Sequence, residues 1–145
     1  MVTHGDESFP KSRRLLRPSE FDRVYRFRRT AAEGALVLYA CPRPFGSGEP
    51  QPARLGMSVS RRIGNAVVRN AWKRRLREAF RTAGSRIPAG HDYVVVVRSG
   101  TAPQGAEAAV RIGMTLVGLA TRVVSRPSYR DSEVPADRPT KPRHR

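Results

Sequence analysis

Residues 56–81 read GMSVSRRIGNAVVRNAWKRRLREAFR, and this stretch is the most informative part of the chain. Its first residues alternate as in a strand, a Gly-Asn turn follows, and the remainder has a helical period. Asn65 is a favourable N-cap, and Gly84 supplies a usual helix stop. The stretch therefore predicts a strand over 54–60 and a helix from about 65 to 83.

The predicted helix has two faces of opposite character. On a wheel of about 100° per residue, the apolar arc holds Val68, Trp72, Leu76, Ala79, Phe80 and Ala83. The adjoining arc holds Arg69, Asn70, Lys73, Arg74, Arg77 and Arg81. Between residues 61 and 81 there are eight Lys or Arg and one acid, Glu78. Like charges one turn apart repel, so a polyanionic partner explains this face better than solvent alone.

Composition points in the same direction. The 145 residues contain 28 Lys and Arg against 12 Asp and Glu, a net charge of +16. Such a field favours nucleic acid over an anionic membrane. No apolar run approaches the roughly 20 residues that span a bilayer, and residues 1–10 lack the layout of a signal peptide. The single cysteine, Cys41, is predicted to be a buried strand residue in a reducing compartment. We therefore expect a cytoplasmic protein.

The rest of the chain supplies a sheet and two further helices. A short helix is expected to begin at Pro18, with Phe21, Val24 and Tyr25 as its apolar stripe. Strands are expected over 34–41 and 91–98. A last helix is expected over 105–125, with apolar positions Val110, Met114, Val117, Ala120 and Val124.

These elements predict one α+β domain. Residues 1–13 are expected to form a disordered basic arm, 14–125 the domain, and 126–145 a disordered tail rich in Pro and Arg. The order of elements indicates an α/β sandwich with a βαβ crossover centred on the basic helix.

Side-chain catalysis by the protein is not expected. His4, His91 and His144 do not cluster, no Cys/His spacing suggests zinc, and no Ser-His-Asp arrangement can be assigned. The acids are scattered, so no ligand set for an all-protein Mg²⁺ site is predicted. The chain offers cations, amides and aromatic rings, which bind RNA without performing chemistry on it.

Three aromatic residues can be interpreted in two ways. Phe21 and Tyr25 lie one turn apart on the first helix, and Tyr39 lies on the next strand. They can be core residues, or they can form a stacking platform for unpaired bases beside a cationic groove. Spacing alone leaves both interpretations open.

The run from Ser58 to Asn70, continued by Lys73-Arg74 and 76–80, resembles the protein subunit of bacterial ribonuclease P. The resemblance extends to 20–25, 36–39 and 92–95 and covers roughly residues 13–125. It implies an α/β sandwich similar to the second domain of a small-subunit ribosomal protein, with a left-handed βαβ crossover against the usual right-handed rule.

The resemblance also implies a function. Such a protein is an accessory subunit of an endoribonuclease whose RNA subunit, with bound Mg²⁺, removes the 5′ leader of precursor tRNA. The expected contacts with the catalytic RNA come from Arg61, Arg62, Asn65, Arg69, Asn70, Lys73, Arg74 and Arg77. The leader-binding residues would be Phe21, Tyr25 and Tyr39. No membrane, obligate protein partner, catalytic side chain or protein-bound metal is expected.

The chain departs from the family at two places. Ala71 stands where the Arg-Asn-Arg motif has its second arginine, with Arg74 and Arg75 close enough to compensate. Trp72 replaces an aliphatic residue, and its place on the apolar arc predicts that it lies in the core. Two alternatives stay open: a ribosomal or general RNA-binding protein, and a nuclease that acts alone, which the missing carboxylate cluster disfavours.

Overall fold

The structure, a computed structural model, describes residues 9–43, 51–130 and 132–135. The helices and strands, in chain order, are α1 (Pro18–Phe27), β1 (Thr30–Glu33), β2 (Leu36–Pro42), β3 (Arg54–Val59), α2 (Ala66–Ala83), β4 (His91–Val97), α3 (Ala108–Val124) and α4 (Pro127–Arg130). Short 3₁₀ turns are η2 (Lys11–Arg13), η3 (Arg61–Ile63) and η4 (Gly84–Arg86).

The four strands form one mixed sheet in the order β1-β2-β4-β3. β1 pairs with β2, and β2 with β4, in antiparallel fashion, whereas β3 and β4 are parallel and joined through α2. The expected α+β domain with a βαβ unit centred on the basic helix is therefore confirmed. The hand of the crossover stays a prediction from the resemblance.

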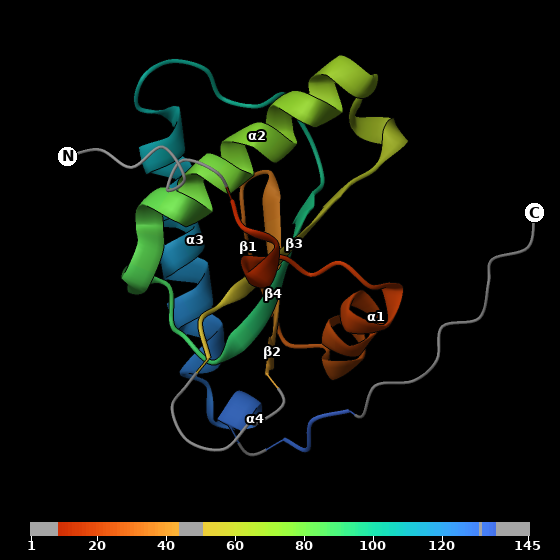
Figure 1. Cartoon of the computed structure of the whole chain (residues 1–145), viewed down its shortest axis with the longest axis vertical. Coiled ribbons are helices and arrows are strands. Elements are labelled where there is room, and N and C mark those ends of the chain that lie inside the picture. Colours follow the sequence, from red (N-terminus) through yellow and green to blue (C-terminus); the bar gives the residue numbers. More distant parts are fainter. Residues whose placement is uncertain (1–8, 44–50, 131, 136–145) are drawn as a thin grey trace, which may run out of the picture.

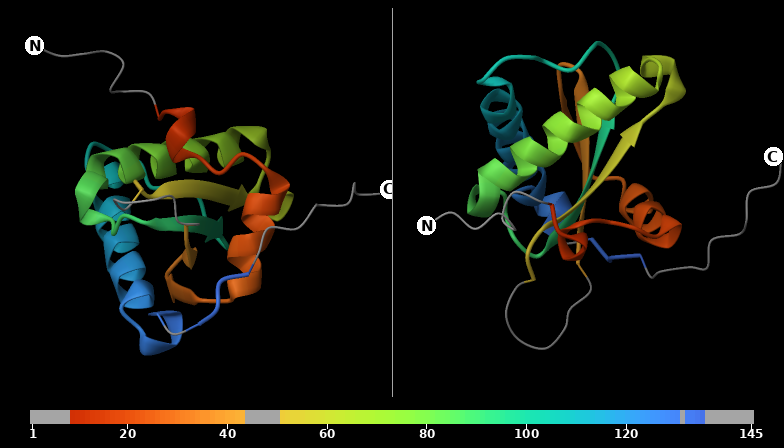
Figure 2. Two further views of the ribbon diagram at one scale, coloured as in Figure 1. Left: turned by 60° about the horizontal axis from the view of Figure 1, so that its bottom comes forward. Right: turned by 45° about the horizontal axis from the view of Figure 1, so that its top comes forward.

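The sheet lies between two helical layers. α1 covers one face, and α2 and α3 pack together over the other (Figures 1 and 2). Side chains along β2 alternate between the two faces of the sheet. Tyr39 and Cys41 contact residues of α1, whereas Leu38 and Ala40 are buried on the opposite face.

The apolar arc predicted for α2 is the face that packs into the core. Trp72, Leu76, Ala79, Phe80 and Ala83 are buried. Val68 is half-buried and packs against the same cluster. The indole N–H of Trp72 donates to the Gly100 carbonyl at 3.1 Å, so this large ring is both packed and satisfied. The prediction that Trp72 lies in the core is confirmed.

The expected apolar positions of α3 are partly wrong. Val110 and Met114 are 50% and 61% exposed. The buried side is formed by Ala108, Ile112, Gly113, Leu116, Leu119, Ala120 and Val123. The reason is a close approach of the two helices, because a Cβ on Gly113 would lie 3.2 Å from the Ala79 carbonyl oxygen of α2. This contact turns the neighbouring apolar side chains outward.

Two ends of the domain extend past the expected boundaries of 14 and 125. Phe9 is buried against Phe80, with ring centroids 5.5 Å apart and nearly perpendicular. Tyr129 of α4 is buried against Phe27 at 5.2 Å. These aromatic contacts tie 9–13 and 126–130 to the core. The remainder of the predicted arm and tail, 1–8 and 136–145, lies outside the described residues.

Candidate nucleic-acid interface

The cations expected to bind RNA follow one another along η3 and α2. Side chains exposed to solvent are those of Arg61, Arg62, Asn65, Asn70 and Arg74, and half-buried ones are those of Arg69, Lys73 and Arg77. Within 9–43, 51–130 and 132–135, none of the six cations in this set pairs with a carboxylate. The face therefore carries positive charge that the described part of the protein leaves uncompensated.

Two members of this set also shape the start of α2. Asn65 is the N-cap, and its side-chain oxygen accepts the N–H of Val68 at 3.0 Å. Arg69 donates from Nε to the Gly64 carbonyl at 3.2 Å. Their polar groups fix the entry into the helix, and this fixes the direction in which the later cations project.

The three aromatic residues lie together on the α1 face of the sheet. The rings of Tyr25 and Tyr39 meet edge to face, with centroids 4.9 Å apart. Phe21 lies over Gly56 of β3 so closely that a Cβ there would come within 2.7 Å of its ring. All three rings are half-buried. They pack on the core and still leave part of their surface accessible to a ligand.

The Tyr25 hydroxyl is tied to β3. Burial raises the pKa of Tyr25, while a hydrogen bond with the Ser58 side chain opposes that shift without cancelling it. The phenol is therefore neutral at physiological pH. It carries a hydrogen-bond donor at the edge of the aromatic surface.

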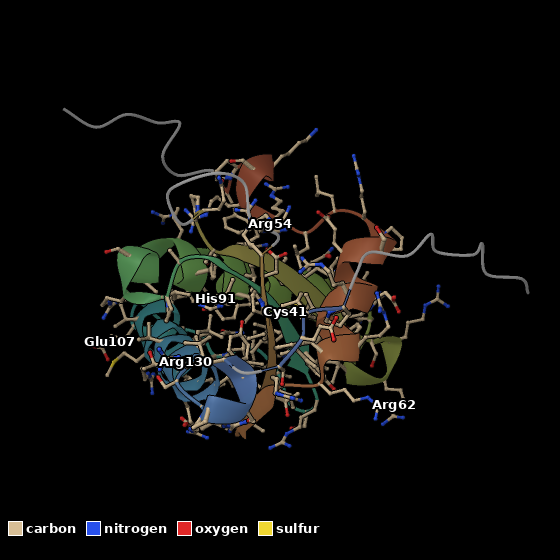
Figure 3. All side chains as sticks on the ribbon, turned by 90° about the horizontal axis from the view of Figure 1, so that it is seen from below. Cys41, Arg54, Arg62, His91, Glu107 and Arg130 are labelled. Atoms are coloured by element: carbon tan, nitrogen blue, oxygen red, sulfur yellow. The ribbon has the colours of Figure 1, made fainter. Side chains whose placement is uncertain are left out.

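A pocket of about 470 Å³ continues this surface at the ends of β3 and β4. Its lining includes Ser60, Arg62, Val96 and Arg98. Val96 pairs in register with Ser58, the partner of Tyr25, so the rings and the pocket share one face of the sheet. Arg62 extends outward at the edge of the molecule (Figure 3). The three rings and this pocket with its two cations therefore lie on the same face of the sheet, which is the candidate cleft beside α1.

A buried ion cluster anchors α1 beside this cleft. Asp92 of β4 is fully buried and accepts from Arg23 of α1, which is only 2% exposed. Arg54 of β3 binds the same carboxylate through two contacts, Nε to Oδ1 at 2.8 Å and Nη2 to Oδ2 at 2.7 Å. The cluster joins one helix to two strands and so fixes where Phe21 and Tyr25 stand.

Glu20 extends this cluster to the start of α1. Its carboxylate accepts from Arg54 Nη1 at 2.9 Å and from the N–H groups of Leu16 and Arg17. Burial raises the pKa of Glu20, but the N–H donors and the charge of Arg54 outweigh burial and lower it overall. The pKa of Arg54 is raised, chiefly by its hydrogen bonds to Asp92.

Sequence reasoning missed this cluster because its members are distant along the chain. One signal pointed to it: Asp92 is followed by Tyr93 and then by four valines, an unbroken apolar run that is typical of a strand covered on both faces. A carboxylate placed there must be paired.

The Ribonuclease P family matches residues 9–116. The ribonuclease P protein component of Brevibacillus brevis is 41% identical over 99 residues, which cover 68% of this chain and 75% of that protein. The chain belongs to the ribonuclease P protein family. The ribonuclease P protein component of Gluconacetobacter diazotrophicus is 40% identical over 92 residues, which cover 63% of this chain and 76% of that protein.

Solved structures of the family share the fold. The RNase P protein from Thermotoga maritima aligns with a TM-score of 0.59 at 25% identity, covering 76% of this chain and 96% of that one. The Staphylococcus aureus protein aligns with a TM-score of 0.54 at 29% identity, covering 79% and 94%.

The structure distinguishes the two arginines that could compensate for Ala71. Arg75 is engaged, because it donates to Glu78 at 3.1 Å and to the Pro103 carbonyl at 3.2 Å. Arg74 is exposed and lacks a carboxylate partner among the described residues. Of the two, Arg74 is the cation available to a ligand.

Other reactive groups serve the core. Burial raises the pKa of Cys41 to about 11, so its thiol is protonated, as expected for a buried strand residue. The His91 ring lies 2.6 Å from the Tyr129 hydroxyl, and burial lowers its pKa. Over the described ranges, no group of three or more His, Cys, Asp or Glu could hold a metal ion. Likewise, no helix in these ranges is sufficiently long and apolar to cross a membrane.

Proposed function

We propose that this chain binds the RNA subunit of ribonuclease P through η3 and α2 and holds the 5′ leader of precursor tRNA in the cleft beside α1. Family membership supports the partner. The observation that carries the residue assignment is the row of cations on α2 without carboxylate partners among the described residues. The protein then assists endonucleolytic removal of the leader by a cytoplasmic ribonucleoprotein.

The two proposed contacts use different chemistry. Phosphates of a folded RNA need cations at fixed positions, which an α-helix with a capped start provides. A leader is single-stranded and varies in sequence among tRNA precursors. Half-buried aromatic rings suit it because stacking tolerates any base.

Mg²⁺ is proposed to be bound mainly by the RNA of the holoenzyme. The described residues offer no set of three carboxylate, imidazole or thiol ligands. The role of this chain is then to bind and orient, and its cations lower the repulsion between two polyanionic RNAs.

Reconstitution tests the proposal directly. Purified protein is mixed with a bacterial ribonuclease P RNA at low Mg²⁺, and cleavage of precursor tRNA is measured. We expect the protein to raise the rate, and protein without RNA to cleave nothing. Cleavage by the protein alone would support a nuclease acting by itself. Copurification with ribosomal RNA, rather than with one species of a few hundred nucleotides, would support a general RNA-binding role.

Replacing Arg69 or Lys73 by alanine is expected to weaken assembly with the catalytic RNA and to flatten its salt dependence. Each lost phosphate contact should change the slope of log affinity against log salt by roughly 0.7–0.9. Affinities measured across a salt series give the slope. Arg122→Ala on α3, an exposed cation outside the proposed interface, is the matched control. Unchanged slopes and unchanged assembly in both variants would disprove the phosphate contacts.

Replacing Tyr25 or Tyr39 by alanine is expected to weaken binding of precursor tRNA to the reconstituted enzyme. Loss of one stacked base corresponds to about 1–3 kcal/mol. Mature tRNA, which lacks the leader, should bind as before, and assembly with the catalytic RNA should persist. Both tRNA affinities are measured after each variant is shown to be folded. Equal losses for precursor and mature tRNA would mean that the rings only support the core.

A further inference from the structure

A second groove lies in the helical layer, away from the aromatic cleft. It has a volume of about 370 Å³ and runs between the first half of α2 and residues 101–104, before α3. Its apolar lining comes from Val67, Val68, Ala71, Ala102 and Pro103. This size falls within the range of about 300–1,000 Å³ typical of small-ligand pockets.

Hydrogen bonds hold the walls of this groove in place. The Trp72 N–H donates to the Gly100 carbonyl at 3.1 Å, and Arg75 Nε donates to the Pro103 carbonyl at 3.2 Å. Ala102, between these two points, is buried. The segment is therefore fixed against α2, and the groove exists before any ligand binds.

Two features make the groove accessible to a ligand. Val67 is 76% exposed, although it lies on a helix whose apolar arc is otherwise directed into the core. Ala71 contributes only a methyl group to the lining, so the space beside it stays open. At the rim are the exposed cation Arg74 and the polar side chains of Thr101 and Gln104.

We propose that this groove receives one unpaired nucleobase of the ribonuclease P RNA. The base would lie against Val67, Ala71 and Pro103, with its phosphate near Arg74. Thr101 and Gln104 carry donors and acceptors suited to a base edge. The inference rests on the proposed function, since it requires that α2 face the catalytic RNA.

Charge and position favour a nucleobase over an apolar side chain of another protein. The chain has a net charge of +16, and the groove is bordered by Arg74 within the row of cations proposed to bind phosphates. The groove lies on the side of the sheet opposite α1, so the proposed leader cleft does not reach it. Proteins that recognise RNA commonly stack unpaired bases on aromatic rings or Arg guanidinium planes and hydrogen-bond their edges, and in this groove Arg74, Thr101 and Gln104 can supply the guanidinium plane and the hydrogen bonds.

Substitutions that fill the groove or remove part of its apolar lining test the proposal without changing the charge of the protein. Ala71→Leu fills the space, and Val67→Ser removes an apolar contact from a side chain too exposed to matter for folding. Each variant is assayed for affinity to the catalytic RNA alone, across a salt series. Dimethyl sulfate and a carbodiimide then report which unpaired bases the bound protein protects.

We expect wild-type protein to protect a nucleotide that becomes reactive again in the Ala71→Leu complex. Affinity should fall about tenfold in Ala71→Leu and by a smaller factor in Val67→Ser, with the salt slope unchanged because no phosphate contact is lost. Ala66→Leu, on an exposed position of the same helix, and Val110→Ser, on α3, are the matched controls and should behave as wild type.

Three results would overturn the proposal: wild-type affinity in both groove variants, a reduced salt slope, or a pattern of protected bases that neither variant changes. The first result would favour the alternative that an apolar side chain of another protein occupies the groove. If Ala71→Leu does not fold, Val67→Ser alone decides between these results. Failure of the wild-type protein to bind the catalytic RNA at all would instead defeat the proposed function.

Discussion

Replacing Asp92 by alanine is expected to lower the free energy of unfolding by about 3–5 kcal/mol, because it removes a buried carboxylate that accepts from both Arg23 and Arg54. Asp92 is fully buried, and Arg23, which donates to it, is 2% exposed. Arg54 loses a bidentate contact in the same step. Arg23 also donates to the Pro42 carbonyl at 2.8 Å and to the Cys41 sulfur at 3.4 Å, and neither of these two acceptors carries a full negative charge.

Urea denaturation of the full chain measures this loss. Glu33→Gln is the control, since the Glu33–Arg122 pair is 3.8 Å apart and more than half exposed on both sides, where an ion pair contributes about 0–1 kcal/mol. A mild variant, Asp92→Asn, keeps the shape of the side chain and removes the charge. Equal stability of Asp92→Ala and Glu33→Gln would show that the buried cluster is not what fixes α1 to the sheet.

The ion cluster also shows where prediction from sequence ends. The buried face of α2 could be predicted because helical periodicity is local: Trp72, Leu76 and Phe80 repeat every four residues and are all buried. The pairing of Arg23 with Asp92 spans 69 positions, and no periodicity encodes it. Only the sheet register, which sets Arg54 opposite Asp92 on adjacent parallel strands, brings these groups together.

Local reasoning also failed where two faces were equally apolar. α3 has apolar residues on both the 110/114 and the 112/116 lines, so the pattern cannot say which line faces the core. The close packing of Gly113 against the α2 backbone determines which of the two lines faces the core. β1 was missed for a different reason, since only Ala31 of its four residues is buried and the strand lies at the sheet edge.

Some features of the candidate site could likewise be predicted from the sequence, and others could not. The excess of cations could be predicted by counting charges in the sequence, and their place on one face of α2 could be predicted from the helical wheel. Phe21, Tyr25 and Tyr39 share one surface because α1 crosses the sheet. The sequence predicts that the helix and the sheet exist, but it does not predict how α1 lies on the sheet. The groove beside Ala71 could not have been predicted, because its far wall is a loop whose position depends on two hydrogen bonds from α2.

Replacing Trp72 by alanine is expected to lower the free energy of unfolding by about 3–5 kcal/mol, the usual cost of truncating a large buried aromatic ring. The ring is 2% exposed and belongs to the core between α2, α3 and the sheet. The change also removes the N–H that holds the Gly100 carbonyl, so the loop that follows β4 loses one of its two hydrogen bonds to α2.

Trp72→Phe separates these two contributions. It keeps most of the apolar volume and removes the donor, so we expect a loss of roughly 1 kcal/mol, typical of one hydrogen bond. Melting temperature and catalytic-RNA affinity are measured for both variants. If Trp72→Ala kept its melting temperature and lost RNA affinity, the ring would be a stacking residue and its burial would have to be transient. The structure argues against this, because a side chain enclosed on all sides and donating inward has no face left for a base.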